Sequence, residues 1–245
     1  MFLMIEQAIL AHAKEQAPLE ACGLLISTAQ GEQYLPCVNQ HADPKNHFTI
    51  SFDDFIRAEQ QGEVIAVVHS HPDGQHYLSS LDRQLQVNSA LPWWVVCDEK
   101  IHCYQPVPHL LGRQFIHGST DCYGLFRDAY HLAGHDLPDF ERHDNWWRQG
   151  KELYLDNMIS SGFRQVKKEA QPGDIILCCY ASSRANHAGI YLGNQTILHH
   201  IPNQLSKREE YNERWQRMTH SIWRYRDWQP SDFTGICNDL DVALI

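Results

Sequence analysis

The residues of this chain best suited to metal chemistry are two histidines separated by one residue and an aspartate that follows them. His69 and His71 come directly after the apolar run 64–68, whose β-branched residues predict a buried strand. Residues two apart on a strand point to the same side. Asp82 falls in the first turn of a helix predicted from residue 80. Three protein ligands that leave one position for water are the arrangement of a catalytic zinc site, so these residues predict one.

The same residues have a purely structural interpretation. Ser79 and Asp82 have the spacing of a helix capping box, which satisfies backbone donors at a helix start without any metal. His71 precedes Pro72 and could be an ordinary loop histidine. The metal interpretation is favoured because the histidine pair and the aspartate occur together.

A second group of residues suits nucleophilic catalysis. Cys122 follows a Gly-Ser-Thr-Asp turn and begins a predicted helix, whose N-terminal partial positive charge is expected to lower the pKa of the thiol. A cysteine nucleophile needs a base, and His187 begins a predicted strand at 187–192. The alternative is that Cys122 is an inert buried cysteine, and spacing alone does not decide between the two.

The base in turn needs an orienting group, for which His199 and His200 are the candidates. A three-residue loop at 193–195 would pair Gly189 with His199, on the face that His187 also occupies. A two-residue loop would instead bring His200 opposite His187. The register argument favours His199, and His200 remains the alternative.

Length and composition indicate a folded protein of one large domain or two ordinary ones. The chain has 245 residues, of which 43% are hydrophobic and 20% charged, values typical of a globular protein rather than a disordered one. The formal net charge of −10 argues against nucleic-acid binding, because such a surface does not neutralise a phosphate backbone.

The cysteines and the N-terminus indicate a reducing compartment. Eight cysteines occur without a C-x-x-C pair or a repeated spacing, which fits free thiols better than a disulfide framework. The N-terminus lacks the basic region of a signal peptide, and no apolar stretch is long enough to span a bilayer. We therefore expect a protein made in the cytoplasm, without an export signal or an integral membrane segment.

Helices and strands are predicted to mix without strict alternation, which favours the α+β class. The stiff, aperiodic segment 106–112 is the best boundary and predicts domains at 1–106 and 118–245, joined by a linker at 107–117. The patterns predict helices at 4–16, 52–61, 80–91, after Cys122, and at 144–158. They predict strands at 20–26, 48–51, 64–68, 93–97, 101–104, 175–180, 187–192 and 196–201. The run 207–226 is interpreted as a solvated face, and no element is predicted after Trp228.

The first half resembles the JAMM (MPN-type) metalloproteases. The resemblance rests on Glu20 in Glu-Ala-Cys-Gly-Leu, on His-Ser-His-Pro from His69, and on Ser-Ser-Leu-Asp from Ser79, in the expected order and spacing. It implies an α/β sandwich in which His69, His71 and Asp82 hold Zn²⁺. It also implies that Glu20 is the general base on the attacking water and that Ser79 stabilises the oxyanion.

The second half resembles the NlpC/P60 cysteine peptidases, papain-like enzymes that most often cut peptidoglycan stem peptides next to D-glutamate. The resemblance rests on Thr-Asp-Cys-Tyr-Gly-Leu around Cys122, on Asn-His-Ala-Gly-Ile-Tyr-Leu-Gly around His187, and on the histidine twelve residues further on. It implies Cys122 as nucleophile, His187 as base and His199 as the orienting residue. Position 123 is tyrosine, where the cell-wall enzymes usually have serine. This difference bears on the substrate pocket and its specificity rather than on the nucleophile.

The two domain types in this order resemble the tail assembly proteins of lambda-like phages and prophages, and the stretches 111–118 and 198–210 strengthen the match. The resemblance implies a tail-tip component whose partners are other tail-tip proteins and a peptidoglycan peptide. It places the protein in the host cytoplasm during tail assembly and, if carried with the virion, at the cell envelope. The leading prediction is a hydrolase with two separate active sites. The alternatives are a structural assembly factor with dispensable catalysis and a protease that processes another tail protein.

Overall fold

The computed structural model describes residues 2–72, 74–167 and 169–242, and these fall into two compact units that are divided between Val107 and Pro108. Each unit has its own β-sheet with helices, so the predicted α+β class is confirmed. None of the helices within the described ranges is both long enough and apolar enough to cross a membrane. Whether residues 1–106 and 118–245 behave as independent domains stays a prediction.

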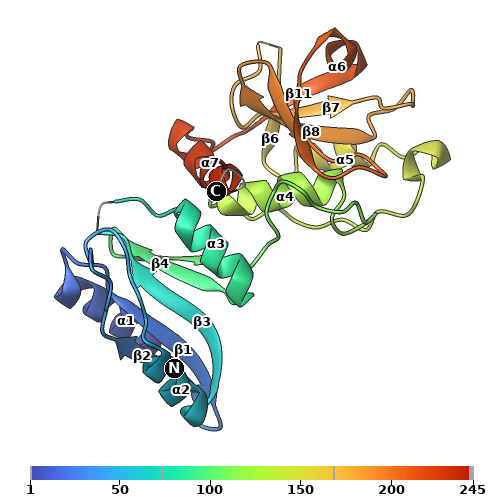
Figure 1. Ribbon diagram of the computed structural model, residues 1–245. Coiled ribbons are helices and arrows are strands. Elements are labelled where there is room, and N and C mark those ends of the chain that lie inside the picture. Colours follow the sequence, from blue (N-terminus) through green and yellow to red (C-terminus); the bar gives the residue numbers. More distant parts are fainter. Residues whose placement is uncertain (1, 73, 168, 243–245) are drawn as a thin grey trace. The chain divides into compact units, whose positions relative to one another are not determined.

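The first unit is built on a five-stranded sheet with the order β2-β1-β3-β4-β5 (Figure 1). Every neighbouring pair is antiparallel except β3 and β4, which are parallel and are connected through a helix. In chain order the elements are α1 (Phe2–Gln16), β1 (Cys22–Thr28), β2 (Gly31–Cys37), α2 (Phe52–Gln61), β3 (Glu63–Ser70), α3 (Ser80–Ser89), β4 (Trp93–Cys97) and β5 (Lys100–Tyr104).

The sheet of the first unit is covered on both faces. Successive residues of a strand face opposite ways, and Leu24 and Leu25 accordingly belong to two different apolar clusters. One cluster includes Ala58 of α2, and the other includes Ile5 and Ile9 of α1. Strands buried on both faces explain the unbroken apolar runs seen in the sequence. The unit is therefore an α/β sandwich.

The second unit contains a six-stranded antiparallel sheet with the order β10-β9-β8-β7-β11-β6. The long helix α4 packs on β8 and β9. Its helices are α4 (Cys122–Leu132), α5 (Leu153–Met158), α6 (Glu213–Met218) and α7 (Phe233–Val242), with short 3₁₀ turns at Trp146–Gln149 and Pro230–Asp232. Its strands are β6 (Phe163–Val166), β7 (Ile175–Cys178), β8 (His187–Gly193), β9 (Thr196–His199), β10 (Lys207–Glu210) and β11 (Thr219–Tyr225).

Three predicted elements differ from the structure. Residues 48–51 are not a strand, and the ring of Phe48 instead stacks on that of His69, with centroids 4.6 Å apart. The helix predicted at 144–158 is interrupted because Asn145 and Gly150 have positive φ values, which end a helix. The run interpreted as a solvated face contains β10, α6 and β11, and α7 lies in the terminal segment for which no element was predicted.

The hairpin between β8 and β9 reaches the predicted register by a different route. Its turn has two residues, Asn194 and Gln195, both with positive φ, rather than the predicted three. A β-bulge between Tyr191 and Gly193 restores the shift that a third loop residue would have given. Gly189 therefore still pairs with His199.

Candidate active sites

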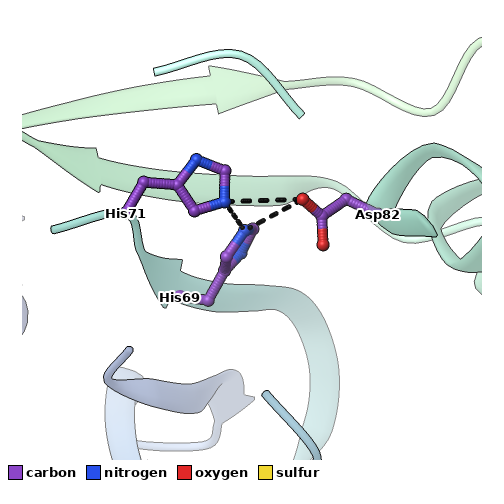
Figure 2. A group of neighbouring side chains, drawn as sticks. All are labelled: His69, His71 and Asp82. Atoms are coloured by element: carbon purple, nitrogen blue, oxygen red, sulfur yellow. Dashed lines mark hydrogen bonds and ion pairs between the residues drawn. The ribbon is translucent and has the colours of Figure 1, made fainter. Parts of the chain in front are cut away.

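The first site lies at the end of β3. Cys22 of β1 pairs with His69 of β3, and His71 follows directly after that strand. The Nε2 atoms of His69 and His71 are 2.9 Å apart, and they lie 3.6 and 3.4 Å from Oδ2 of Asp82 (Figure 2). All three side chains are buried. The structure thus brings the three predicted metal ligands together.

Asp82 is held in place by the capping box that formed the structural alternative. Its Oδ2 accepts hydrogen bonds from the backbone N–H and the hydroxyl of Ser79, while its own backbone N–H donates to the Ser79 hydroxyl oxygen. The cap and the histidine contacts use the same carboxylate, so the two interpretations are compatible. The hydroxyl of Ser79 donates its proton to Asp82, a predicted metal ligand. The role of Ser79 as an oxyanion donor stays a prediction.

Burial favours the neutral form of His69, and the hydrogen bond of His71 orients its ring for a metal ligand. Nδ1 of His71 lies 2.6 Å from the carbonyl oxygen of Gln75, which can only accept, so Nδ1 carries a proton and Nε2 has the lone pair when the ring is neutral. Burial lowers the pKa of His69, which keeps it neutral. Burial also opposes charge on His71, but its hydrogen bond and attraction to Asp82 raise its pKa overall. Burial disfavours the ionised form of Asp82, yet the two histidines hold its pKa well below the usual value.

Glu20 lies beside this site through the pairing of β1 with β3. The backbone N–H of Ser70 donates to the carbonyl of Ala21, and the N–H of Ala21 donates to the Ser70 hydroxyl. This antiparallel pairing brings the residue before Ala21 next to the residue after Ser70, that is, Glu20 next to His71. Glu20 is buried, and its charge contributes to the raised pKa of His71. The structure therefore brings the predicted base to the predicted metal site.

The second site begins at the first turn of α4. Asp121 is the N-cap, and its Oδ1 accepts from the backbone N–H of Gly124. Its other oxygen accepts from Nε of Arg142, which pairs the buried charge. A Cβ atom at position 124 would lie 1.9 Å from the carbonyl oxygen of Ser119, so the chain can turn tightly into the helix only with glycine there. These contacts fix the position of Cys122.

Cys122 is not activated in the way predicted from the sequence. Burial, followed by the negative charge of Asp121, raises the pKa of its thiol to about 11. These effects outweigh the helix N-terminus, because the thiolate would be formed in a desolvated place. The hydroxyl of Tyr154, 3.0 Å from Sγ, acts in the opposite direction and lowers the pKa of the thiol. The expectation of a lowered pKa at rest was therefore wrong.

His187 and Cys122 line the same cavity, which has a volume of about 240 Å³. Burial, and then the neighbouring His199 and His200, lower the pKa of His187 to about 3, so it is neutral at rest. The ring of His199 lies next to that of His187, with centroids 5.5 Å apart. Nε2 of His200 lies 3.2 Å from the carbonyl oxygen of Gln204, and this ring packs on Phe115. The ring contact supports His199 rather than His200 as the neighbour of His187, the predicted base.

Sequence analysis missed two residues of this site. Tyr154 belonged to a predicted helix but received no role, and only the fold brings it to Cys122. Glu209 lies in the segment interpreted as a solvated face, yet its Oε2 is 3.0 Å from Nε2 of the buried His199. The strand Lys-Arg-Glu-Glu contains no apolar residue, so no pattern in it could have predicted this contact. Tyr123 does not line the cavity; it packs among Phe126, Phe140 and Arg142.

Two family models match the chain, and each covers one of the structural units. Residues 4–107 match the prokaryotic homologs of the JAB domain, and residues 112–224 match the NlpC/P60 family. Both are peptidase families. The fold and the two sites thus define a protein with a JAB-type domain followed by an NlpC/P60 domain.

Two curated relatives align with this chain over most of their own length. The tail tip assembly protein K of Escherichia phage lambda is 60% identical over 195 residues, which cover 79% of this chain and 98% of that protein. The protein of the same name from Escherichia phage N15 is 36% identical over 227 residues, covering 90% and 93%. The chain belongs to the family of tail tip assembly protein K.

Among solved structures, a lipoprotein-like protein of the NLP/P60 family from Staphylococcus aureus aligns with a TM-score of 0.34 and 20% identity. The alignment covers 46% of this chain and 36% of that one.

Proposed function

We propose that this protein is a phage tail-tip component that cleaves peptidoglycan stem peptides with Cys122, His187 and His199. We further propose that its JAB-type unit is a zinc-dependent peptidase or isopeptidase. The observation that carries the proposal is that Cys122 and His187 line one cavity with His199 packed behind the base. A nucleophile, a base and an orienting group in this order are the requirements of a cysteine peptidase.

The resting pair of Cys122 and His187 is neutral, because burial raises the pKa of the thiol and lowers that of the imidazole. The thiol proton therefore moves to His187 as sulfur attacks the peptide carbonyl, rather than beforehand. Collapse of the tetrahedral adduct breaks the C–N bond, and the imidazolium gives the proton to the leaving amine. Water, deprotonated by His187, then hydrolyses the thioester and regenerates the thiol.

The residues of the first site fit a zinc ion. Two imidazole nitrogens and one carboxylate oxygen lie within 4.8 Å of one another, and the His71 tautomer leaves Nε2 available. This donor set leaves a coordination position for substrate or water, as catalytic zinc sites do. His69, His71 and Asp82 are the proposed ligands.

A zinc ion in this position would supply Lewis acidity and lower the pKa of a water molecule. Glu20, buried beside His71, is the proposed acceptor of the water proton and its donor to the leaving amine. Ser79 holds Asp82 and is also the proposed oxyanion donor, for which its hydroxyl would have to rotate away from the carboxylate.

The relatives support the proposed setting. Both are tail tip assembly proteins, so the proposed partners of this chain are other tail-tip proteins, with assembly in the host cytoplasm. A wall peptidase carried at a tail tip would act at the cell envelope during entry. The proposed range for the JAB-type domain is 1–106 and that for the cysteine peptidase is 118–245, with residues 107–117 as the linker.

Particle assembly tests the proposed function against a purely structural role. A phage that lacks this gene is complemented with the wild type, with Cys122→Ala or with His69→Ala, and particles and infectivity are counted separately. Catalysis in the wall predicts normal particle numbers but reduced infectivity for Cys122→Ala. Full infectivity of both variants would favour the structural role. A tail protein whose size changes only with an intact His69 would identify the zinc site as a processing protease.

A further inference from the structure

Three adjacent strands each contribute one residue to a line that leads from the edge of the second sheet to the proposed base. β10 carries Glu209, β9 carries His199 and β8 carries His187. β10 is the edge strand, and its Lys207 pairs with His199 across the ladder. Glu209 lies two residues further along β10, so it shares a face with Lys207 and reaches His199 diagonally.

The contact between Glu209 and His199 fixes a proton. Oε2 of Glu209 lies 3.0 Å from Nε2 of His199, and a carboxylate can only accept. The pKa of Glu209 is lowered to about 2; burial opposes the shift, but hydrogen bonds from neighbours that include Lys207 and His199 outweigh it. Burial lowers the pKa of His199, which keeps the ring neutral. A neutral imidazole has one N–H, so Nε2 of His199 carries it and Nδ1 is an acceptor.

The next contact is indicated by two buried nitrogens without partners. Within the described part of the chain, Nδ1 of His199 and Nε2 of His187 are both buried and have no hydrogen-bond partner. They belong to adjacent rings with centroids 5.5 Å apart and planes at 82°. The two nitrogens are not hydrogen-bonded to each other in this structure. A buried polar atom without a partner is costly, and a bond from a His187 Nε2–H to His199 Nδ1, formed when the two adjacent rings move together, would satisfy both atoms.

We propose that Glu209 is a positioning residue of the cysteine site, which sets the tautomers of His199 and then of His187. With its proton on Nε2, His187 keeps the lone pair of Nδ1 for the thiol proton of Cys122. When the thiol proton arrives at Nδ1, His187 becomes the imidazolium, and neither His199 nor Glu209 changes its protonation state. The inference rests on the proposed cysteine chemistry and adds a carboxylate to it.

Among the charged or titratable groups around His199, Glu209 is the one that can select its tautomer. The charged or titratable groups facing this ring are His187 and His200, together with Lys207 and Glu209 of β10. The ammonium group of Lys207 donates to the same Glu209 oxygen, at 2.9 Å. It has no acceptor atom, so it cannot accept the proton of His199. Trp215 packs on the ring edge to face, with centroids 4.7 Å apart.

Histidine tautomers in the ¹⁵N-labelled full chain test the proposal without any substrate. Two-bond ¹H–¹⁵N spectra are expected to show His199 and His187 protonated on Nε2 in the wild type. In Glu209→Ala, His199 is expected to lose this preference, whereas Glu209→Gln, which keeps an acceptor oxygen, should retain much of it. Glu210→Ala, at an exposed neighbouring position of the same strand, is the matched control and should leave both tautomers unchanged.

The reactivity of Cys122 gives a second measurement. Alkylation of Cys122 by iodoacetamide, followed by peptide mass spectrometry, is expected to be about tenfold slower in Glu209→Ala than in Glu210→Ala, the loss typical of a hydrogen bond to a charged group. Nδ1 protonation of His199 in the wild type, or unchanged tautomers in Glu209→Ala, would overturn the proposal. If the tautomers behave as expected but the wild type cleaves no wall peptide, the proposed function fails while the positioning role stands.

Discussion

The sulfur atom of Cys122 lies 3.0 Å from the hydroxyl oxygen of Tyr154, although the two residues are 32 positions apart in the chain. Both side chains line the cavity that also contains His187. Burial and Asp121 raise the pKa of this thiol, and the Tyr154 hydroxyl has the largest opposing effect, ahead of the backbone of Ala188 and the charge of Arg142. Tyr154 therefore offers a donor to the thiolate as it forms.

Replacement of Tyr154 by phenylalanine removes this donor and little else. We expect a higher Cys122 pKa and an alkylation rate at neutral pH about tenfold lower, because a hydrogen bond to a charged group is lost. The rate is measured by iodoacetamide labelling over a pH series. Tyr130→Phe is a useful comparison, since that buried hydroxyl bonds to the carbonyl of Gly173 instead. A rate in Tyr154→Phe equal to the wild type would exclude this role.

Asp82 contributes both to the helix cap and to the proposed zinc site, whereas Ser79 belongs to the cap but is not a proposed zinc ligand. Variants at the two positions should therefore separate zinc binding from helix capping. Asp82→Asn and His69→Ala should lose stoichiometric zinc, measured by elemental analysis after dialysis. Ser79→Ala should destabilise the first unit by about 1 kcal/mol through loss of the cap but keep the metal. Full zinc content in His69→Ala would contradict the proposed ligands.

Acidification should destabilise the protein in part through His187. Its pKa is about 3 in the folded chain, against the usual 6.5, so below pH 6.5 the unfolded chain binds a proton that the folded chain does not. Stability is therefore full above pH 6.5 and falls as the pH drops from 6.5 toward 3, by at most about 1.4 kcal/mol per pH unit for one group. In urea unfolding, His187→Gln should have a shallower pH dependence over this window. Parallel curves for the two proteins would show that His187 titrates normally.

The sequence predicted local chemistry better than distant contacts. His69 lies near the end of a strand, His71 directly after that strand, and Asp82 in the next helix, so short-range spacing reveals that the three come together. Glu209 reaches His199 through strand pairing, and Tyr154 reaches Cys122 through helix packing. Neither contact leaves a periodic trace in the sequence.

Register and pKa values show the same limit. The pairing of Gly189 with His199 was predicted correctly, but a bulge rather than a longer loop produces it, and single-sequence turn chemistry does not reveal a bulge at Leu192. The predicted direction of the Cys122 pKa shift was wrong. Desolvation of the thiol depends on how deeply the fold buries it, and the sequence does not show this depth. Phe48 was predicted to lie in a strand but does not. Its ring packs on that of His69, and this tertiary contact overrides the local β propensity.

Digestion of purified peptidoglycan tests the central claim most directly. Wild type, Cys122→Ala and His69→Ala are incubated with the wall, and the products are identified by mass spectrometry, with circular dichroism to confirm each fold. Catalysis by Cys122 predicts stem-peptide fragments from the wild type and from His69→Ala, and none from Cys122→Ala. Fragments from a folded Cys122→Ala protein, or none from a folded wild type, would contradict it.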